Sequence, residues 1–285
     1  MKSHNAGCPV SLTLGGLQLQ GFAISALASY VMVPSLGACF DLGHCPIEAV
    51  GLDTIFLSHV HKDHVAGLPL YLSLRTMQEM KPAKVYCPES SRDALLKMLD
   101  AFDRMEGPVV YDRSKEIIGV RPGDTFRHGK NTIRVFGVHH RIDSVGYTVV
   151  ENRSKLRPEY VGKSGEEIRL AKLRGEPVTD TLQKDIFTYV GDSTSKTLED
   201  HPELAASEVL MVEATYLPGT PVEKASVYGH THLEELVSLR ARCPELLSNP
   251  HLVLKHFSMR YDREMVMSAL KALPEEFQQN TTALI

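Results

Sequence analysis

A segment with three histidines and one aspartate, HVHKDH, directly follows the apolar run at residues 53–58 and constrains this chain more than any other feature. The run has the length and composition of a buried strand. His59 and His61 then lie on the same side of an extended chain, because side chains alternate along a strand. Asp63 and His64 follow where the chain turns into a segment of helical length, and they can face a second point nearby. Imidazoles and carboxylates at this density suit zinc and similar borderline metals; the alternative is a surface loop that happens to be rich in histidine.

The composition is that of a folded chain without disulfides. There are 285 residues, of which 43% are apolar, and the formal net charge is −4. This apolar content excludes a disordered protein, and the mild acidity argues against a generally basic protein that coats nucleic acid. The five cysteines are odd in number and include no CxxC pair, which favours reduced thiols in a reducing compartment.

Neither a signal peptide nor a membrane span is expected. The N-terminus has no basic stretch followed by an apolar one. Residues 17–40 are apolar enough to raise the question of a span, but Gln, Gly and Pro interrupt them and no Lys or Arg flanks them. We therefore expect a soluble, cytoplasmic protein with no membrane partner.

The order of elements predicts a single mixed α/β domain over residues 1–285. Strands come first by themselves and later alternate with helices, which is typical of a layered fold. We expect strands at residues 11–14, 17–25, 30–33, 38–42, 53–58, 85–87, 132–138, 146–150, 186–190, 208–212 and 252–254. We expect helices at residues 65–80, 90–104, 166–174, 233–242 and 262–273. Residues 152–184, which are polar and mixed in charge, form a short excursion around the middle helix.

Other histidines and acids also follow predicted strands, at the edge where ligands bind in layered α/β folds. The candidates are His140, Asp192, Glu213 and His256, and His230 lies shortly before the helix expected at 233–242. Asp192 sits in a Gly-Asp-Ser sequence that is common in turns and helix caps. Its position after a predicted strand is what makes it a candidate ligand. Taken alone, Glu213 and His230 would be an ordinary pair at a helix N-terminus.

Six segments in order resemble one family. They are HVHKDH with GLP behind it, HRIDSVGY from His140, YVGDS ending at Ser193, VEAT at 212–215, GHTH at 229–232 and KHFSMRY at 255–261. Together they cover most of the chain from about Asp41 to Tyr261, and they are similar to the metallo-β-lactamase superfamily. The later segments resemble its ribonuclease Z (tRNA 3′-endonuclease) branch in particular.

This resemblance implies a four-layer αββα sandwich and a site for two divalent metal ions. Zinc is the expected metal, and manganese or iron is compatible with the same ligands. The residues carried over for one metal are His59, His61 and His140; those for the other are Asp63, His64 and His256; Asp192 bridges both. His139 competes with His140, but the spacing to Gly146 and Tyr147 favours His140.

The resemblance also implies catalytic roles for Asp63, Glu213 and His230. Glu213 and His230 form an acid/base couple, in which the carboxylate orients the imidazole. Asp41 is expected to contact a metal histidine rather than the metal. His232 has no assigned role. Two roles stay open for Ser258, Arg260 and Tyr261, which either touch a substrate phosphate or fix the terminal helix.

The expected activity is that of a metal-dependent phosphodiesterase that removes the 3′ trailer of tRNA precursors as a homodimer. Two departures from the family pattern bear on this expectation. Lys62 replaces the glycine of HxHGDH, and the excursion at 152–184 shows no Gly-rich arm, as in the short plant and cyanobacterial forms. The alternatives are a phosphodiesterase of small esters, a thioester or lactone hydrolase, and a non-catalytic nucleic-acid-binding relative.

Overall fold

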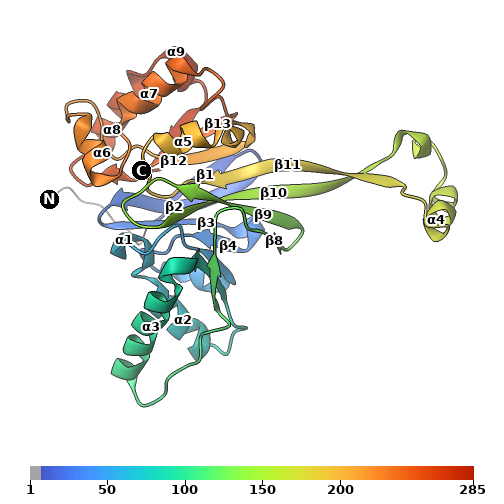
Figure 1. Ribbon diagram of the computed structural model, residues 1–285, viewed down its shortest axis with the longest axis horizontal. Helices are drawn as coiled ribbons and strands as arrows, with labels where there is room; N and C mark the ends of the chain where they lie inside the picture. Colours follow the sequence, from blue (N-terminus) through green and yellow to red (C-terminus); the bar gives the residue numbers. More distant parts are fainter. Residues whose placement is uncertain (1–7) are drawn as a thin grey trace.

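Two β-sheets pack face to face and carry helices on their outer faces in the computed structural model, which describes residues 8–285 (Figure 1). The first sheet has the order β1-β2-β3-β4-β5-β6-β7, with β14 beside β2. Its strands are β1 (Val10–Leu14), β2 (Leu17–Ser25), β3 (Ala28–Val33), β4 (Ala38–Phe40), β5 (Thr54–Phe56), β6 (Lys84–Pro88), β7 (Ile117–Val120) and β14 (Phe257–Ser258). The N-terminal residues 1–4, on which the expectation of no signal peptide rests, lie outside the described residues.

The second sheet has the order β15-β13-β12-β11-β10-β9-β8. Its strands are β8 (Thr125–His128), β9 (Asn131–Val138), β10 (Ser144–Leu156), β11 (Thr179–Tyr189), β12 (Val209–Glu213), β13 (His251–Lys255) and β15 (Thr281–Ala283). Strands β11, β12 and β13 are parallel neighbours, as are β4 and β5 in the first sheet. Parallel neighbours end at the same edge of a sheet, so the segments that follow them are brought together there.

Three apolar layers hold the sandwich together. Between the sheets, Phe40 stacks on Phe56 and on Tyr189, with ring centroids 5.2 and 5.3 Å apart. A second layer joins the first sheet to α2 (Leu68–Met77) and α3 (Arg92–Glu106). A third joins the other sheet to α5 (Lys196–Asp200), α7 (Leu233–Arg242), α8 (Arg263–Lys271) and α9 (Glu275–Gln278). Because each sheet is covered on both faces, the predicted αββα arrangement is confirmed.

The expected helix at residues 65–80 is divided in two. Its first part belongs to a single turn, α1 (Lys62–Val65), and its second part is α2. Gly67 lies between them because a side chain there would meet backbone atoms of Leu42 and His44 at 2.6–2.8 Å. Within the described residues, no helix combines the length and the apolar character needed to cross a membrane.

The excursion at residues 152–184 is an arm that projects far from the body (Figure 1). The sequence predicted no such arm, and placed strands only at 146–150 and 186–190. In the structure β10 and β11 stay paired out to Leu156 and Thr179. The outer residues are exposed on both faces, so they lack the alternation by which a strand is recognised. The arm ends in α4 (Gly165–Leu173), which confirms the helix expected there and begins with a capping box.

Candidate metal centre

The HVHKDH segment follows β5 and runs into α1. His59 and His64 are fully buried. Gly191 allows the close approach of the other sheet, because a Cβ atom on it would lie 2.5 Å from Ser58 Oγ. Asp192 follows Gly191 directly and is therefore held against the histidines of the first sheet.

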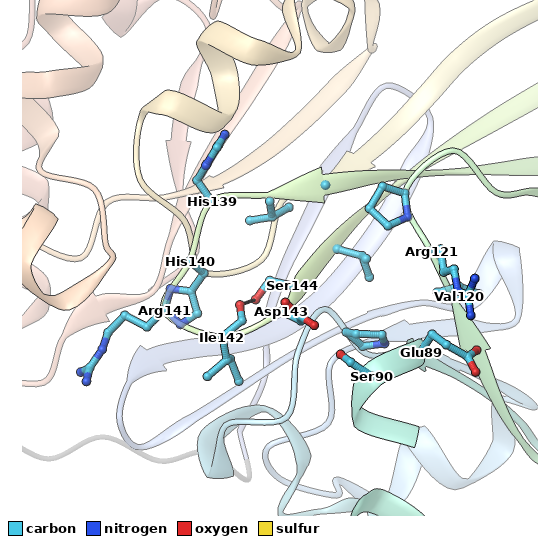
Figure 2. Close-up of a pocket in the computed structure, with 15 residues that line it drawn as sticks. Glu89, Ser90, Val120, Arg121, His139, His140, Arg141, Ile142, Asp143 and Ser144 are labelled. Atoms are coloured by element: carbon cyan, nitrogen blue, oxygen red, sulfur yellow. Dashed lines mark hydrogen bonds between the residues drawn. The ribbon is translucent and has the colours of Figure 1, made fainter. Parts of the chain in front are cut away.

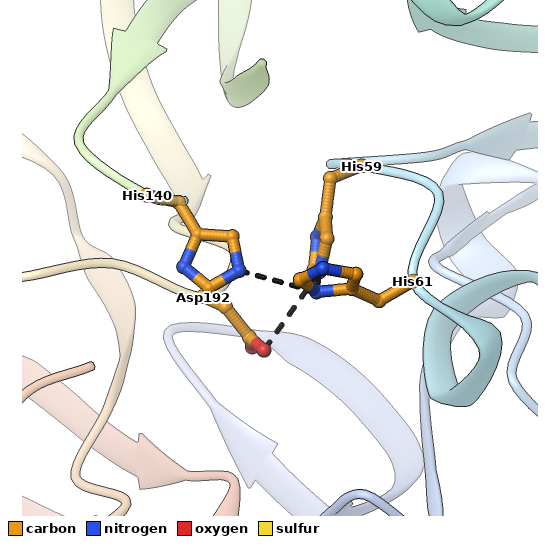
Figure 3. A group of neighbouring side chains, drawn as sticks. All are labelled: His59, His61, His140 and Asp192. Carbon is orange, nitrogen blue, oxygen red and sulfur yellow. Dashed lines mark hydrogen bonds and ion pairs between the residues drawn. The ribbon is translucent and has the colours of Figure 1, made fainter. Parts of the chain in front are cut away.

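One group of potential ligands contains His59, His61, His140 and Asp192 (Figure 3). Their candidate ligand atoms all lie within 4.8 Å of one another. His61 Nδ1 is 3.0 Å from His59 Nε2 and 3.2 Å from His140 Nε2. Burial lowers the pKa of each of the three histidines. Neutral imidazoles offer lone pairs, so this group suits a metal ion.

A second group contains Asp63, His64, His256 and again Asp192. Asp192 Oδ2 is 3.2 Å from His64 Nε2 and 3.3 Å from His256 Nε2. Asp63 Oδ2 is 3.5 Å from His256 Nε2. The structure therefore brings together all seven residues that the sequence selected, in two groups that share Asp192.

The donor set fits metal ions. Asp192 is 1% exposed, and its Oδ1 atom has no hydrogen-bond partner among the described residues. A buried carboxylate oxygen without a partner is costly, and a cation is the partner that it lacks. Several imidazole nitrogens also face one another at contact distance, where a shared cation relieves the crowding of lone pairs.

Asp41 orients the second group. It is fully buried and accepts hydrogen bonds from His64 Nδ1, Tyr189 Oη and both the backbone N–H and hydroxyl of Ser58, at 2.7–3.0 Å. Burial alone would lower the pKa of His64, but the carboxylates of Asp192 and Asp41 raise it to about 10. The predicted contact between Asp41 and a histidine of the cluster is confirmed.

The remaining histidines are oriented by groups that sequence reasoning did not select. His59 Nδ1 is 3.0 Å from Ser58 Oγ, and His256 Nδ1 is 3.0 Å from Thr215 Oγ1. His140 Nδ1 donates to the backbone oxygen of Gly229 at 2.7 Å. Ser58 directly precedes HVHKDH and Thr215 ends VEAT, and these positions are the signal that could have identified them. Such partners fix the ring so that its other nitrogen faces the ligand position.

Glu213 and His230 are in contact beside the two groups. Glu213 is fully buried at the end of β12, and its Oε1 is 2.8 Å from His230 Nδ1. The backbone N–H groups of Ser193 and Thr231 donate to the same carboxylate. Burial alone would lower the pKa of His230, but Glu213 raises it to about 9. The pair can therefore hold a proton on an imidazole next to the metal groups.

The other histidines of the motifs serve the fold. His139 is exposed and pairs with Asp200 at 2.6 Å, away from the ligand groups. This agrees with the choice of His140 over His139. His232 is buried and caps α7, where its Nδ1 accepts from the N–H of Glu234.

In the KHFSMRY motif, Tyr261 and Arg260 differ in their surroundings. Tyr261 is buried, and its hydroxyl contacts the N–H of Leu217 and the hydroxyl of Thr220, so it fixes a loop. Arg260 is exposed, and among residues 8–285 it donates only to Ser258 Oγ, at 3.1 Å. Arg260 is therefore free to meet a solvent-borne anion.

A cavity of about 700 Å³ adjoins the first group (Figure 2). His140 lines it and also belongs to that group. Figure 2 shows Glu89 and Arg121 on the far side of the cavity from His140. The cavity therefore borders the first ligand group at His140.

Comparisons with known proteins agree with this geometry. The sequence model of a family described as β-lactamase superfamily domain matches residues 38–257. The tRNase Z TRZ1 of Arabidopsis thaliana is 31% identical over 278 residues, which cover 96% of this chain and 97% of that protein. The chloroplastic tRNase Z TRZ2 of the same plant is 31% identical over 267 residues, which cover 90% of this chain and 73% of that protein. The crystal structure of the short form of human tRNase Z superposes with a TM-score of 0.59 at 20% identity, covering 96% of both chains.

Proposed function

This chain belongs to the β-lactamase superfamily and, within it, to the tRNase Z family, and we propose that it is a metal-dependent endoribonuclease that removes the 3′ trailer of tRNA precursors. The observation that carries the proposal is the pair of ligand groups that share Asp192 beside the Glu213–His230 couple. The proposed location is the cytoplasm and the proposed assembly is a homodimer.

Two divalent ions would be held by the ligand groups. His59, His61 and His140 would hold one, Asp63, His64 and His256 would hold the other, and Asp192 would contact both. Zinc is the proposed metal because histidine and aspartate are its usual ligands, and manganese and iron share them. Paired ions of this kind stabilise negative charge on a phosphate and make water a nucleophile near neutral pH.

The protein itself contributes to the cleavage by holding a proton on the oriented ring of His230. His230 Nδ1 is committed to Glu213, so Nε2 is the atom that can give a proton to the leaving oxygen. Glu213 favours the protonated ring, and its other oxygen is held by Thr215 and the N–H of Thr231. A carboxylate fixed by several donors keeps the imidazole in one orientation.

The test is cleavage of a 3′-extended tRNA precursor by protein supplied with zinc or manganese. A bis-aryl phosphate is the parallel substrate, and Asp192→Ala is the inactive control. Cleavage next to the discriminator base, lost in the variant, supports the proposal. Turnover of the small ester alone would contradict tRNA as substrate and favour a general phosphodiesterase. Turnover of neither, in protein that holds two metals, would favour a thioester or lactone hydrolase.

A further inference from the structure

Lys255 is a fully buried lysine to which the proposed chemistry gives no role. It is the last residue of β13 and directly precedes His256. Its Nζ atom has no hydrogen-bond partner among the described residues, and no carboxylate there pairs with it. Lysines are almost never fully buried without a partner, because the ammonium group loses its hydration. What this group contacts in place of water therefore indicates what it does.

The contact of Lys255 is the ring of Tyr189. Lys255 Nζ lies 4.6 Å from the centre of that ring. Because β12 lies between β13 and β11, the side chain reaches across one strand to Tyr189 at the end of β11. An aromatic face attracts a cation, and more strongly where water is absent. Lys255 is thereby held in the layer between the sheets, to which Tyr189 belongs.

Tyr189 connects the ammonium group to the metal centre. Its hydroxyl donates to Asp41 Oδ2 at 2.8 Å, and the same oxygen is 2.8 Å from His64 Nδ1. Burial, followed by the charges of Asp41 and Asp192, raises the pKa of Tyr189. The hydroxyl therefore stays protonated and remains a donor. The two carboxylates thus act electrostatically on the ring that Lys255 contacts.

Four carboxylates are gathered at the centre. Asp41, Asp192 and Glu213 are buried, and the side chain of Asp63 is 14% exposed. Charges interact strongly where water is excluded, because the effective dielectric constant is well below that of water. The Lys255 ammonium group is therefore attracted to these carboxylates, and it repels any cation that binds among them.

We propose that Lys255 is a positioning residue whose buried ammonium group competes with metal ions for the carboxylates of the centre. It balances their charge before metal binds, and it lowers the affinity of the group formed by Asp63, His64, His256 and Asp192 for its ion. This group is affected most because Tyr189 and Asp41 join Lys255 to His64. The proposal rests on the proposed function, since it requires metal ions in the ligand groups.

The test is the zinc affinity of the full-length protein, stripped of metal and titrated at one fixed pH against a chromophoric chelator. The titration gives two stepwise dissociation constants. Lys255→Met removes the charge and keeps a long side chain, Lys255→Gln is a second neutral variant, and Lys255→Arg keeps the charge. The matched control is Lys196→Met, which removes an exposed cation in α5, four residues after Asp192. Thermal melting of the metal-free proteins verifies that each variant is folded.

Lys255→Met is expected to lower the larger dissociation constant about tenfold, because a nearby cation no longer repels the metal. Lys255→Arg should bind zinc as the wild type does. Lys196→Met should differ by less than about twofold, because water and salt screen an exposed charge. A purely structural role would instead weaken zinc binding in the neutral variants, through misplaced ligands.

A dissociation constant that is unchanged or raised in both Lys255→Met and Lys255→Gln would overturn the proposal, and so would an equal fall in Lys196→Met. The two proposals remain separable. Tighter zinc binding by the neutral variants of a protein that never cleaves a tRNA precursor contradicts the proposed function alone. Cleavage by the wild type together with unchanged constants in the variants contradicts the role of Lys255 alone.

Discussion

The metal centre and the arm both depend on charged side chains but use them in opposite ways. In the centre, Asp41, Glu213 and Asp192 are buried, and the first two accept several hydrogen bonds each. In the arm, Arg169 and Glu166 are exposed and pair with each other at 2.6 Å. Buried charges are costly unless each is fully partnered, whereas exposed pairs contribute little. Precise geometry is therefore confined to the centre, and the exposed pairs of the arm contribute little to its stability.

The two regions also differ in packing. The body has three apolar layers, while the arm has only a small cluster around Tyr160, Ala171 and Val178. The arm is held mainly by the ladder between β10 and β11 and by its α4 cap. We therefore expect changes in the centre to affect metal binding and catalysis strongly, and changes in the arm to leave the body unaffected.

The largest effect is expected for Asp192→Ala. Both ligand groups lose their shared member, so the protein should bind less than two metals and lose activity by roughly 10³-fold or more. Metal content by mass spectrometry and hydrolysis of a bis-aryl phosphate measure the two losses. Asp200→Ala is the matched control, since the one ion pair of its carboxylate among the described residues is with the exposed His139. Full metal content in Asp192→Ala would show that this carboxylate is not a ligand.

His230→Ala is expected to slow cleavage by about 10²- to 10⁴-fold with the metals retained, because only the proton donor is lost. The pH profile sharpens the assignment. Glu213 raises the pKa of His230 to about 9, so the protonated donor is present below that pH and is lost as pH rises through it. In Glu213→Gln the descending limb of the rate should move to lower pH. A limb at the same pH in both proteins would exclude His230 as the donor.

Asp41→Asn is expected to weaken metal binding by about 10- to 100-fold without removing a ligand, because His64 loses the carboxylate that orients it. Competition with a chromophoric chelator measures the change. Asp53, directly before the neighbouring strand β5, contacts Thr54 and not the cluster, so Asp53→Asn should bind metal as the wild type does. Equal affinities in the two variants would contradict the role of Asp41.

The smallest effect on the centre is expected from removal of the arm. Glu151 and Lys184 are cross-strand partners, so residues 152–183 can be replaced by an Asn-Gly turn that closes the hairpin. Hydrolysis of the bis-aryl phosphate should change less than about twofold, as for surface changes remote from a site. A large loss with this small substrate would show that the arm supports the centre, and would break the contrast between the two regions.

Much of the centre could be predicted from the sequence because its ligands are chemically distinctive. His59, His61, Asp63 and His64 lie within six residues, and Asp192 follows a recognisable strand. The alternation of apolar residues likewise identified most strands of the sandwich. These features depend on neighbours along the chain, so local patterns were sufficient to find them.

The partners of the ligands could not be predicted, because they come from distant segments. Tyr189 and Asp41 are 148 positions apart, and the hydrogen bond to His140 is accepted by a backbone oxygen, which carries no residue signature. The arm was missed for a different reason. Its strands are polar on both faces, and only their mutual pairing defines them.

The sequence by itself thus predicted the type of fold, the candidate ligands and the Glu213–His230 pair, from the dense HVHKDH segment and from the resemblance of six ordered segments to one family. Only the tertiary structure decided which groups orient each histidine and how far the arm projects. These depend on contacts between segments that meet only after both sheets have formed. Charge in particular is a local property in the sequence but becomes available or neutralised only through its neighbours in space.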